Sequence, residues 1–274
     1  MVIDAHVHFW KYHPVKDAWI TDDMAIIRRD FLPNDAQDIF ARNAVDGCVA
    51  VQASQSLEEN QFLSALATES DSIKGIVGWV DLAAPDVAQT LNHLKNEPKL
   101  KGFRHVAQSE PDGFLVRNEI LNGIREVGKQ GFTYDILIYG HQLIDAIQLS
   151  EALPGQPFVI DHCAKPALRT NSITTWKQQI KEIAQNPDMH CKVSGLLTED
   201  HWHNCNEKQL KECLDLIFES FGTSRILFGS DWPVVLVAGH YAQWKAVIAE
   251  YVSQFTTQEQ DAIFGGNAVR FYNL

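Results

Sequence analysis

Short apolar runs rich in β-branched residues recur along the chain, and each is followed by a polar stretch and a segment with helical periodicity. These runs predict strands at residues 2–9, 47–52, 74–81, 100–105, 133–139, 157–162, 190–194 and 225–231. Apolar positions spaced three and four apart predict helices at residues 58–69, 86–96, 118–129, 142–152, 174–185, 207–221 and 241–255. Strand and helix therefore alternate along nearly the whole chain.

Strict alternation of this kind implies a parallel sheet, and eight strand–helix units imply that the sheet closes. We expect an α/β fold, a single-domain (β/α)8 TIM barrel over residues 1–274. An open doubly wound sheet is the alternative, but the first strand–helix turn lacks the glycine fingerprint of dinucleotide folds. The segment Gly265-Gly266-Asn267 is predicted to be a loop and a helix start, and residues 11–32 a lid over one end of the barrel.

Composition agrees with a large globular core, because 45% of residues are hydrophobic and 21% are charged. The net charge of −12, without any basic run, argues against nucleic acid and anionic membranes as partners. No stretch approaches the roughly 20 apolar residues of a membrane span, and no signal sequence precedes the first strand, so we expect a cytoplasmic protein. Five cysteines without CxxC spacing predict neutral thiols. The oligomeric state is left open.

The end of the first strand carries reactive side chains. A period of two places Asp4, His6 and His8 on one face of this strand, with the apolar residues between them on the other. Two imidazoles at this spacing suit one metal ion or one substrate oxygen. Taken alone, a His-x-His pattern is as typical of hydrogen-bonded histidines inside a barrel as it is of a metal or catalytic site.

Two further strand ends carry groups of the same kind. His162 follows the sixth strand with Lys165 just beyond it, and Asp231 follows the eighth strand with Trp232 beside it. A lone histidine is commonly structural, and an Asp in a Gly-Ser-Asp turn is commonly a turn former. Because catalytic groups of such barrels sit at the carboxyl ends of strands, the convergence of three strand ends favours an active site.

A second His-x-His pattern, at His201 and His203, lies in a polar stretch after the seventh strand. No strand fixes the two rings on one side there. We therefore expect an exposed loop or lid position for this pair and no metal site.

Four sequence motifs, taken in their order along the chain, resemble those of a known protein family. The motifs are DAHVH at 4–8, DHCAKP at 161–166, KVSGL at 192–196 and GSDWP at 229–233. Together they resemble the amidohydrolase superfamily, in particular its lactonase branch with L-fuconolactonases, L-rhamnonolactonases and lactonases of aromatic-acid breakdown. The likeness extends to GNA at 266–268 and RFY at 270–272. It implies a TIM barrel that hydrolyses a small-molecule lactone, with active-site positions matched by His6, His8, His162 and Asp231.

The chain departs from the superfamily pattern where a second metal ion would bind. The fourth strand offers Arg104 and His105 but no bridging lysine, and the fifth strand carries no histidine. A two-metal centre therefore lacks ligands. One divalent ion, with zinc favoured, is expected on the three histidines and Asp231, and a metal-free site is the alternative.

Lactone hydrolysis needs an activated water, stabilisation of the developing oxyanion and groups that orient the ring. Asp231 is the candidate general base, and the three histidines are the candidates for polarising the carbonyl. Strand alternation turns His105 away from the face of Arg104, which makes it a weaker candidate. Substrate contacts are expected from Arg104, His105, Lys165, Trp10 and Trp232.

Two other functions fit the same residues less well. Another reaction of the superfamily, such as decarboxylation of an aromatic acid or amide hydrolysis, is disfavoured by the fifth strand without histidine. A non-catalytic barrel that binds a metabolite is disfavoured because Asp231 and the histidine cluster are both present.

Overall fold

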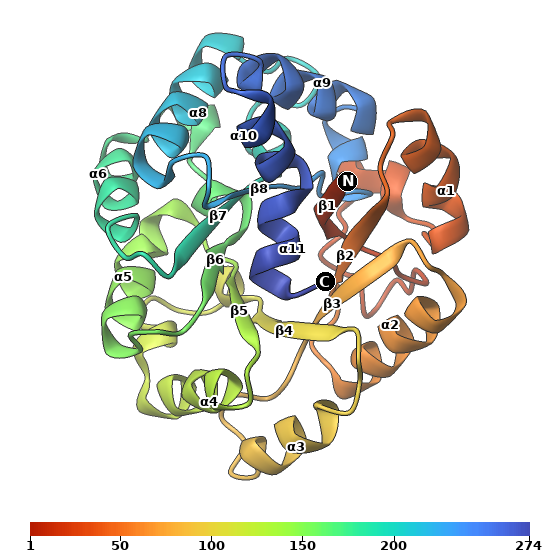
Figure 1. Ribbon diagram of the computed structural model, residues 1–274, viewed down its shortest axis with the longest axis vertical. Helices are drawn as coiled ribbons and strands as arrows, with labels where there is room; N and C mark the ends of the chain where they lie inside the picture. The colour runs from red at the N-terminus through yellow and green to blue at the C-terminus, as the bar shows by residue number, and fades with distance from the viewer.

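The computed structural model describes all residues, 1–274, and its centre is one parallel sheet of eight strands in sequential order. The strands are β1 (Ile3–Val7), β2 (Gly47–Val51), β3 (Ile73–Gly78), β4 (Leu100–His105), β5 (Thr133–Ile136), β6 (Phe158–Ile160), β7 (Met189–Val193) and β8 (Ile226–Phe228). Figure 1 shows them as a ring seen along its axis, with helices around the outside. The expected TIM barrel is confirmed.

The helices follow the strands as the alternation predicted. They are α1 (Pro33–Arg42), α2 (Leu57–Glu69), α3 (Val87–Leu94), α4 (Asn118–Lys129), α5 (Leu143–Ala152), α6 (Thr174–Ile183), α7 (Leu196–Glu199), α8 (Glu207–Phe221), α9 (Tyr241–Val252), α10 (Thr257–Asp261) and α11 (Asn267–Tyr272). Side-chain caps start several of them: Ser56 Oγ accepts from Glu59 N, and Asn206 Oδ1 from Gln209 N. None of the helices combines the length and the apolar character needed to cross a membrane.

The ring closes next to the first His-x-His motif. His8 N donates to Trp232 O at 2.7 Å, and Asp231 N donates to His6 O at 2.9 Å. An isolated parallel bridge joins Val7 to Trp232. The same backbone contacts that complete the barrel thus hold the ends of β1 and β8 side by side.

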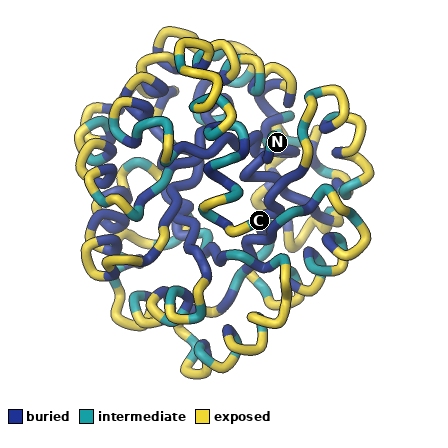
Figure 2. The backbone as a smooth tube through the Cα atoms, viewed as in Figure 1, coloured by how far each residue is buried: buried dark blue, intermediate teal, exposed yellow.

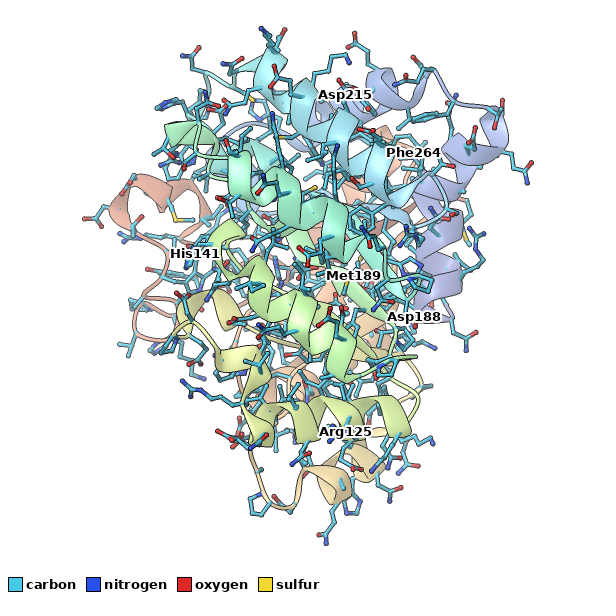
Figure 3. All side chains as sticks on the ribbon, turned by 90° about the vertical axis from the view of Figure 1, so that its left-hand side faces the viewer. Arg125, His141, Asp188, Met189, Asp215 and Phe264 are labelled. Carbon is cyan, nitrogen blue, oxygen red and sulfur yellow. The ribbon has the colours of Figure 1, made fainter.

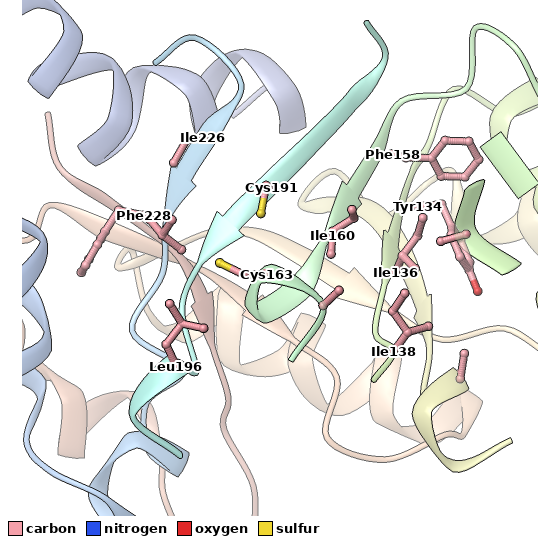
Figure 4. Packing of buried hydrophobic residues seen from close by; sticks show 14 of the residues in the cluster. Tyr134, Ile136, Ile138, Phe158, Ile160, Cys163, Cys191, Leu196, Ile226 and Phe228 are labelled. Carbon is pink, nitrogen blue, oxygen red and sulfur yellow. The ribbon is translucent and has the colours of Figure 1, made fainter. Parts of the chain in front are cut away.

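Strand alternation separates two apolar layers. Residues such as Tyr134, Ile136 and Phe158 face the helices, where Figure 4 shows them packed in the larger core. A smaller cluster fills the inside of the barrel: Ile3, Ala5, Val49, Val51, Val77, Val159, Leu227, Ala268 and Tyr272. Figure 2 shows the buried strands inside a ring of helices whose outer sides are exposed.

The two ends of the barrel are covered differently. Helix α11 lies across the end where the strands begin (Figure 1), and Tyr272 from this helix belongs to the inner cluster. The β1–α1 connection contains the short helix η1 (Asp22–Ile27), and two hydrogen bonds of 2.9 Å between Trp10 and Phe31 join its two ends. In Figure 3, His141 marks the end where strands finish and Met189 the end where β7 begins.

Several boundaries differ from the sequence-based prediction. Strands β5, β6 and β8 end at Ile136, Ile160 and Phe228, earlier than predicted, because the apolar runs continue beyond the ladder into irregular turns. Helix α1 was not predicted at all. The predicted loop at Gly265-Gly266 is wrong, since both glycines belong to the helical segment η8 (Ala262–Gly266), which leads into α11. A Cβ on Gly265 would collide with Met1 O, which explains the small residue there.

Candidate active site

A pocket of about 330 Å³ opens at the end of the barrel where the strands finish. Its polar lining includes His8, Arg104, His162, Lys165 and Asp231, and Trp10 and Trp19 add an aromatic side. A hollow of about 860 Å³ lies beside Met1 and Arg270 and has no histidine in its lining. The reactive side chains therefore line the pocket of about 330 Å³. This end of the barrel is also where active sites of this fold lie.

His6, His8 and Asp231 form one compact group at the bottom of this pocket. His6 Nε2 lies 3.1 Å from His8 Nε2, and Asp231 Oδ1 lies 3.4 Å from His8 Nε2 and 3.8 Å from His6 Nε2. His6 is completely buried, while His8 and Asp231 keep 6% and 4% exposure. His6 therefore supports the pocket from below, and the other two face into it.

The same three groups fit a single divalent cation. His8 Nδ1 bonds to the carbonyl oxygen of Val51 at 2.8 Å, so Nδ1 carries the proton and Nε2 offers its lone pair. Ligand atoms around a tetrahedral zinc ion, each about 2.0–2.2 Å from it, lie roughly 3.3 Å apart, close to the separations seen here. His162 does not belong to this group of possible ligands, and instead forms a second group with His6 and Asp161. Arg104 Nη1 lies 3.2 Å from His6 Nε2.

His162 stands on an unusual turn after β6. The residues from His162 to Lys165 have φ values of 53°, 54°, 57° and 44°, a left-handed turn without glycine. Trp176 Nε1 donates to Cys163 O at 2.8 Å and Lys165 N donates to His162 O at 2.9 Å, which stabilises the turn. The turn directs both His162 and Lys165 into the pocket.

The segment after β7 fixes the His162 ring. Ser194 Oγ is hydrogen-bonded to His162 Nδ1 at 2.8 Å, and both residues are buried. Gly195 has a φ of +66°, and a Cβ there would lie 2.7 Å from the imidazole. His162 Nε2 consequently points toward Asp231 Oδ1, 3.9 Å away.

Electrostatics keep the imidazoles of His6 and His162 neutral and the carboxylate of Asp231 charged. Burial lowers the pKa of His6 and of His162 well below the usual histidine value, and the nearby carboxylates Asp161 and Asp231 oppose this only in part. Burial also acts to raise the pKa of Asp231, but the neighbouring side chains of His162, His8 and Lys165 together lower it. At neutral pH, the ionised carboxylate of Asp231 therefore lies beside the neutral rings of His6 and His162.

A buried layer of charges lies under the histidines. Arg104 Nη1 donates to Asp161 Oδ2 at 3.0 Å, and Lys192 Nζ lies 3.0 Å from Asp161 Oδ1 and 2.5 Å from Asp135 Oδ2. Burial opposes ionisation of Asp161, but Lys192, His6 and Arg104 hold its pKa well below the usual value. Two cations thus balance two carboxylates.

Sequence reasoning did not propose Lys192, Asp135 or Asp161 as site residues. The sequence shows charged residues inside otherwise apolar strands, at positions that strand alternation turns toward the barrel interior. A charged residue in a buried strand needs a partner, so this pattern was the available signal. Which residues pair with which depends on the strand stagger, which the sequence does not show.

Three expectations about individual side chains are wrong. A β-bulge between Asp4 and Val7 breaks the period of two, so Asp4 points outward, where it accepts hydrogen bonds from Ser230 N and Tyr241 Oη. Trp232, predicted to line the pocket, is 1% exposed and packs edge-on against Phe9 and Phe31.

The third wrong expectation is that His105 contacts the substrate. His105 stacks on Phe114 and bonds to Glu110 at 2.9 Å, away from the pocket. Alternation along β4 turns it outward while Arg104 faces in.

The remaining candidates lie at the mouth of the pocket. Lys165 Nζ is 3.5 Å from Glu199 Oε1 and 5.6 Å from the centre of the Tyr139 ring. Trp10 packs edge-on against Trp19 of the β1–α1 connection, with ring centres 5.9 Å apart. The predicted lid thus contributes residues to the pocket wall.

The chain is similar to known proteins along nearly its whole length. The model of a family described as amidohydrolase matches residues 3–274. The chain belongs to the amidohydrolase family. An L-fucono-1,5-lactonase from Burkholderia multivorans is 33% identical over 284 residues, which cover 99% of this chain and 96% of that protein. This confirms the resemblance to the lactonase branch.

Solved structures of the family extend the comparison. A crystal structure of an amidohydrolase from Burkholderia multivorans with bound zinc has a TM-score of 0.96 at 33% identity, over 100% of this chain and 99% of that chain. A probable 2-pyrone-4,6-dicarboxylic acid hydrolase from Acinetobacter baumannii has a TM-score of 0.81 at 16% identity, over 100% and 99% of the two chains. The second likeness concerns the fold alone.

Proposed function

We propose that this amidohydrolase opens a sugar-derived lactone to its hydroxy acid, with L-fucono-1,5-lactone as the first candidate substrate. The observation that carries the proposal is the ionised, nearly buried carboxylate of Asp231 among three imidazoles at the bottom of the pocket. The relative named L-fucono-1,5-lactonase supports the choice of substrate.

Asp231 would act as the general base. It takes a proton from the attacking water as the water oxygen bonds to the lactone carbonyl carbon. The ring C–O bond then breaks, and the same proton passes to the departing ring oxygen. The product carries one carboxyl group and one hydroxyl group. At neutral pH the carboxyl group ionises and releases a proton to solution.

The other groups would bind the ring and the developing charge. Arg104 and His162 face the pocket beside Asp231 and offer donors for the oxyanion. Lys165 at the mouth suits the product carboxylate as a point charge. Trp10 and Trp19 offer an aromatic side for the apolar face of a sugar.

A single zinc ion fits the proposal. His6, His8 and Asp231 would hold it, as their separations allow, and the zinc-bound relative supports this assignment. When bound, such an ion would polarise the lactone carbonyl.

An acid-release assay with a pH indicator tests the proposal. We expect purified protein to hydrolyse L-fucono-1,5-lactone faster than several other pentonolactones and hexonolactones, with the spontaneous rate subtracted. Hydroxybenzoic acids, followed for loss of the carboxyl group, and simple amides serve as substrates for the competing reactions. Turnover of those compounds, with no acid released from any lactone by folded protein, would contradict the proposal.

A further inference from the structure

The end of the barrel opposite the pocket carries a side chain that reaches inward. Tyr272, in the C-terminal helix α11, is 2% exposed and lies among the aliphatic residues inside the barrel. Its hydroxyl donates to Asp135 Oδ2 at 2.7 Å. Figure 1 shows α11 lying across the strand ring at this end.

Asp135 lies between Tyr272 and Lys192, on the side of Tyr272 that faces the pocket. Its Oδ2 lies 2.5 Å from Lys192 Nζ, and Lys192 Nζ in turn lies 3.2 Å from His6 Nδ1. Asp161 Oδ1 lies 3.3 Å from the same ring nitrogen and 3.0 Å from Lys192 Nζ. A continuous chain of polar contacts therefore joins the C-terminal helix to the first histidine of the site.

Folding alone does not account for this chain of charges. Elsewhere inside the barrel the equivalent space is filled by Val49, Val77, Val159 and Leu227. Replacing a buried ion pair by well-packed apolar residues is often neutral or stabilising, so a buried lysine between two carboxylates is a costly way to fill a core. What the polar groups supply, and aliphatic ones do not, is a fixed orientation for the His6 ring.

We propose that Tyr272, Asp135 and Lys192 are positioning residues for His6, so that the C-terminal helix supports the active site from the far end of the barrel. The inference rests on the proposed function for its kinetic effect. Lys192 and Asp161 hold Nδ1 on one side of the ring, which directs Nε2 toward His8 and Asp231. Asp135 fixes Lys192, and Tyr272 fixes Asp135.

Tyr272→Phe tests the proposal with the smallest change, because it removes only the hydroxyl. The matched control is Tyr134→Phe, at a tyrosine that is 1% exposed and next to Asp135 in sequence but packed on the outer face of β5 against Phe158. We expect kcat of Tyr272→Phe to fall about tenfold with KM within twofold, as for partners that orient a site histidine. The control should keep the wild-type kcat. Equal kcat values for the two variants at equal folded concentration would overturn the proposal.

Histidine ring ¹⁵N signals give a second readout that needs no substrate. In metal-free protein labelled at histidine, we expect the His6 ring signals, assigned with His6→Gln, to move in Tyr272→Phe and to stay in place in Tyr134→Phe. Unchanged His6 signals in Tyr272→Phe would overturn the positioning role. Failure of every lactone assay would instead count against the proposed function, and the ring signals would still decide this inference.

Discussion

The chain contains two His-x-His patterns that are alike in sequence and opposite in setting. His6 and His8 end the first barrel strand, where they are 0% and 6% exposed and 3.1 Å apart at their Nε2 atoms. His201 and His203 lie exposed in the loop between α7 and α8. The strand that carries the first pair closes the barrel against the segment holding Asp231.

The difference shows that a His-x-His pattern alone does not indicate a catalytic or metal site. A β-bulge and the closing hydrogen bonds aim the first pair at a carboxylate, and buried partners fix both rings. Side chains in an exposed loop keep their rotamer freedom, so binding a metal or substrate there costs ordering entropy. The predictions below test this contrast, from the largest effect to the smallest.

Asp231→Asn should have the largest effect. The amide cannot take a proton from water, and we expect kcat/KM for lactone hydrolysis to fall by about 10²–10⁴. The measurement is acid release by protein whose folding is verified by circular dichroism. Asp112→Asn is the control, since that carboxylate is 76% exposed beside His141, and it should keep the wild-type rate. Similar rates for the two variants would refute the base assignment.

Removal of a proposed ligand should weaken zinc binding. We expect His6→Gln to lower the zinc affinity by more than the roughly 10–100-fold typical of losing a ligand's hydrogen-bond partner. Competition with a chromophoric chelator measures the affinity, and His201→Gln is the control from the exposed pair. Equal affinities would show that the ion binds elsewhere.

Ser194→Ala should have an intermediate effect. The hydroxyl holds His162 Nδ1 at 2.8 Å, and its loss frees the ring to turn. We expect kcat to fall about tenfold, the lower end of the roughly 10–100-fold range for such partners. Ser150→Ala removes an equally buried hydroxyl bonded to Ile147 O in α5, and it should leave kcat unchanged. A matching loss in both variants would indicate a general effect on stability.

Activity should depend little on pH near neutrality. A general base works when ionised, and the pKa of Asp231 lies below its usual value of 3.8, so its protonation stops the reaction only in strong acid. The pKa values of His6 and His162 lie below 6.5, so both rings stay neutral as pH rises. We expect kcat/KM to stay within about twofold between about pH 5.5 and pH 8. A step in kcat/KM that follows the titration of the His6 or the His162 ring at an ordinary histidine pKa would contradict these shifts.

The sequence predicted the barrel well because strand and helix periods alternate cleanly. It missed α1, although Ala36 and Phe40 lie four residues apart on its buried side and Pro33 in its first turn is a usual helix-start signal. It misplaced Asp4, since a bulge adds one residue to a strand without changing its composition. Local patterns of this kind predict elements more reliably than they predict register.

The candidate site was predicted in part for a related reason. His8, His162 and Asp231 could be grouped because each follows a strand, and parallel strands end at one face. Lys192 and Asp135 could not be paired, because their contact crosses from β7 to β5 inside the barrel. The outward position of Trp232 follows from the bridge to Val7, which is a tertiary contact.

The most direct test of the account compares the two histidine pairs in one assay. The measurement is kcat/KM for L-fucono-1,5-lactone with His8→Gln and with His203→Gln, at equal concentrations of folded protein. We expect His8→Gln to lose about 100-fold or more, whereas His203→Gln should retain the wild-type value. Equal values for the two variants would contradict the claim that the barrel-held pair belongs to the lactone-hydrolysing site.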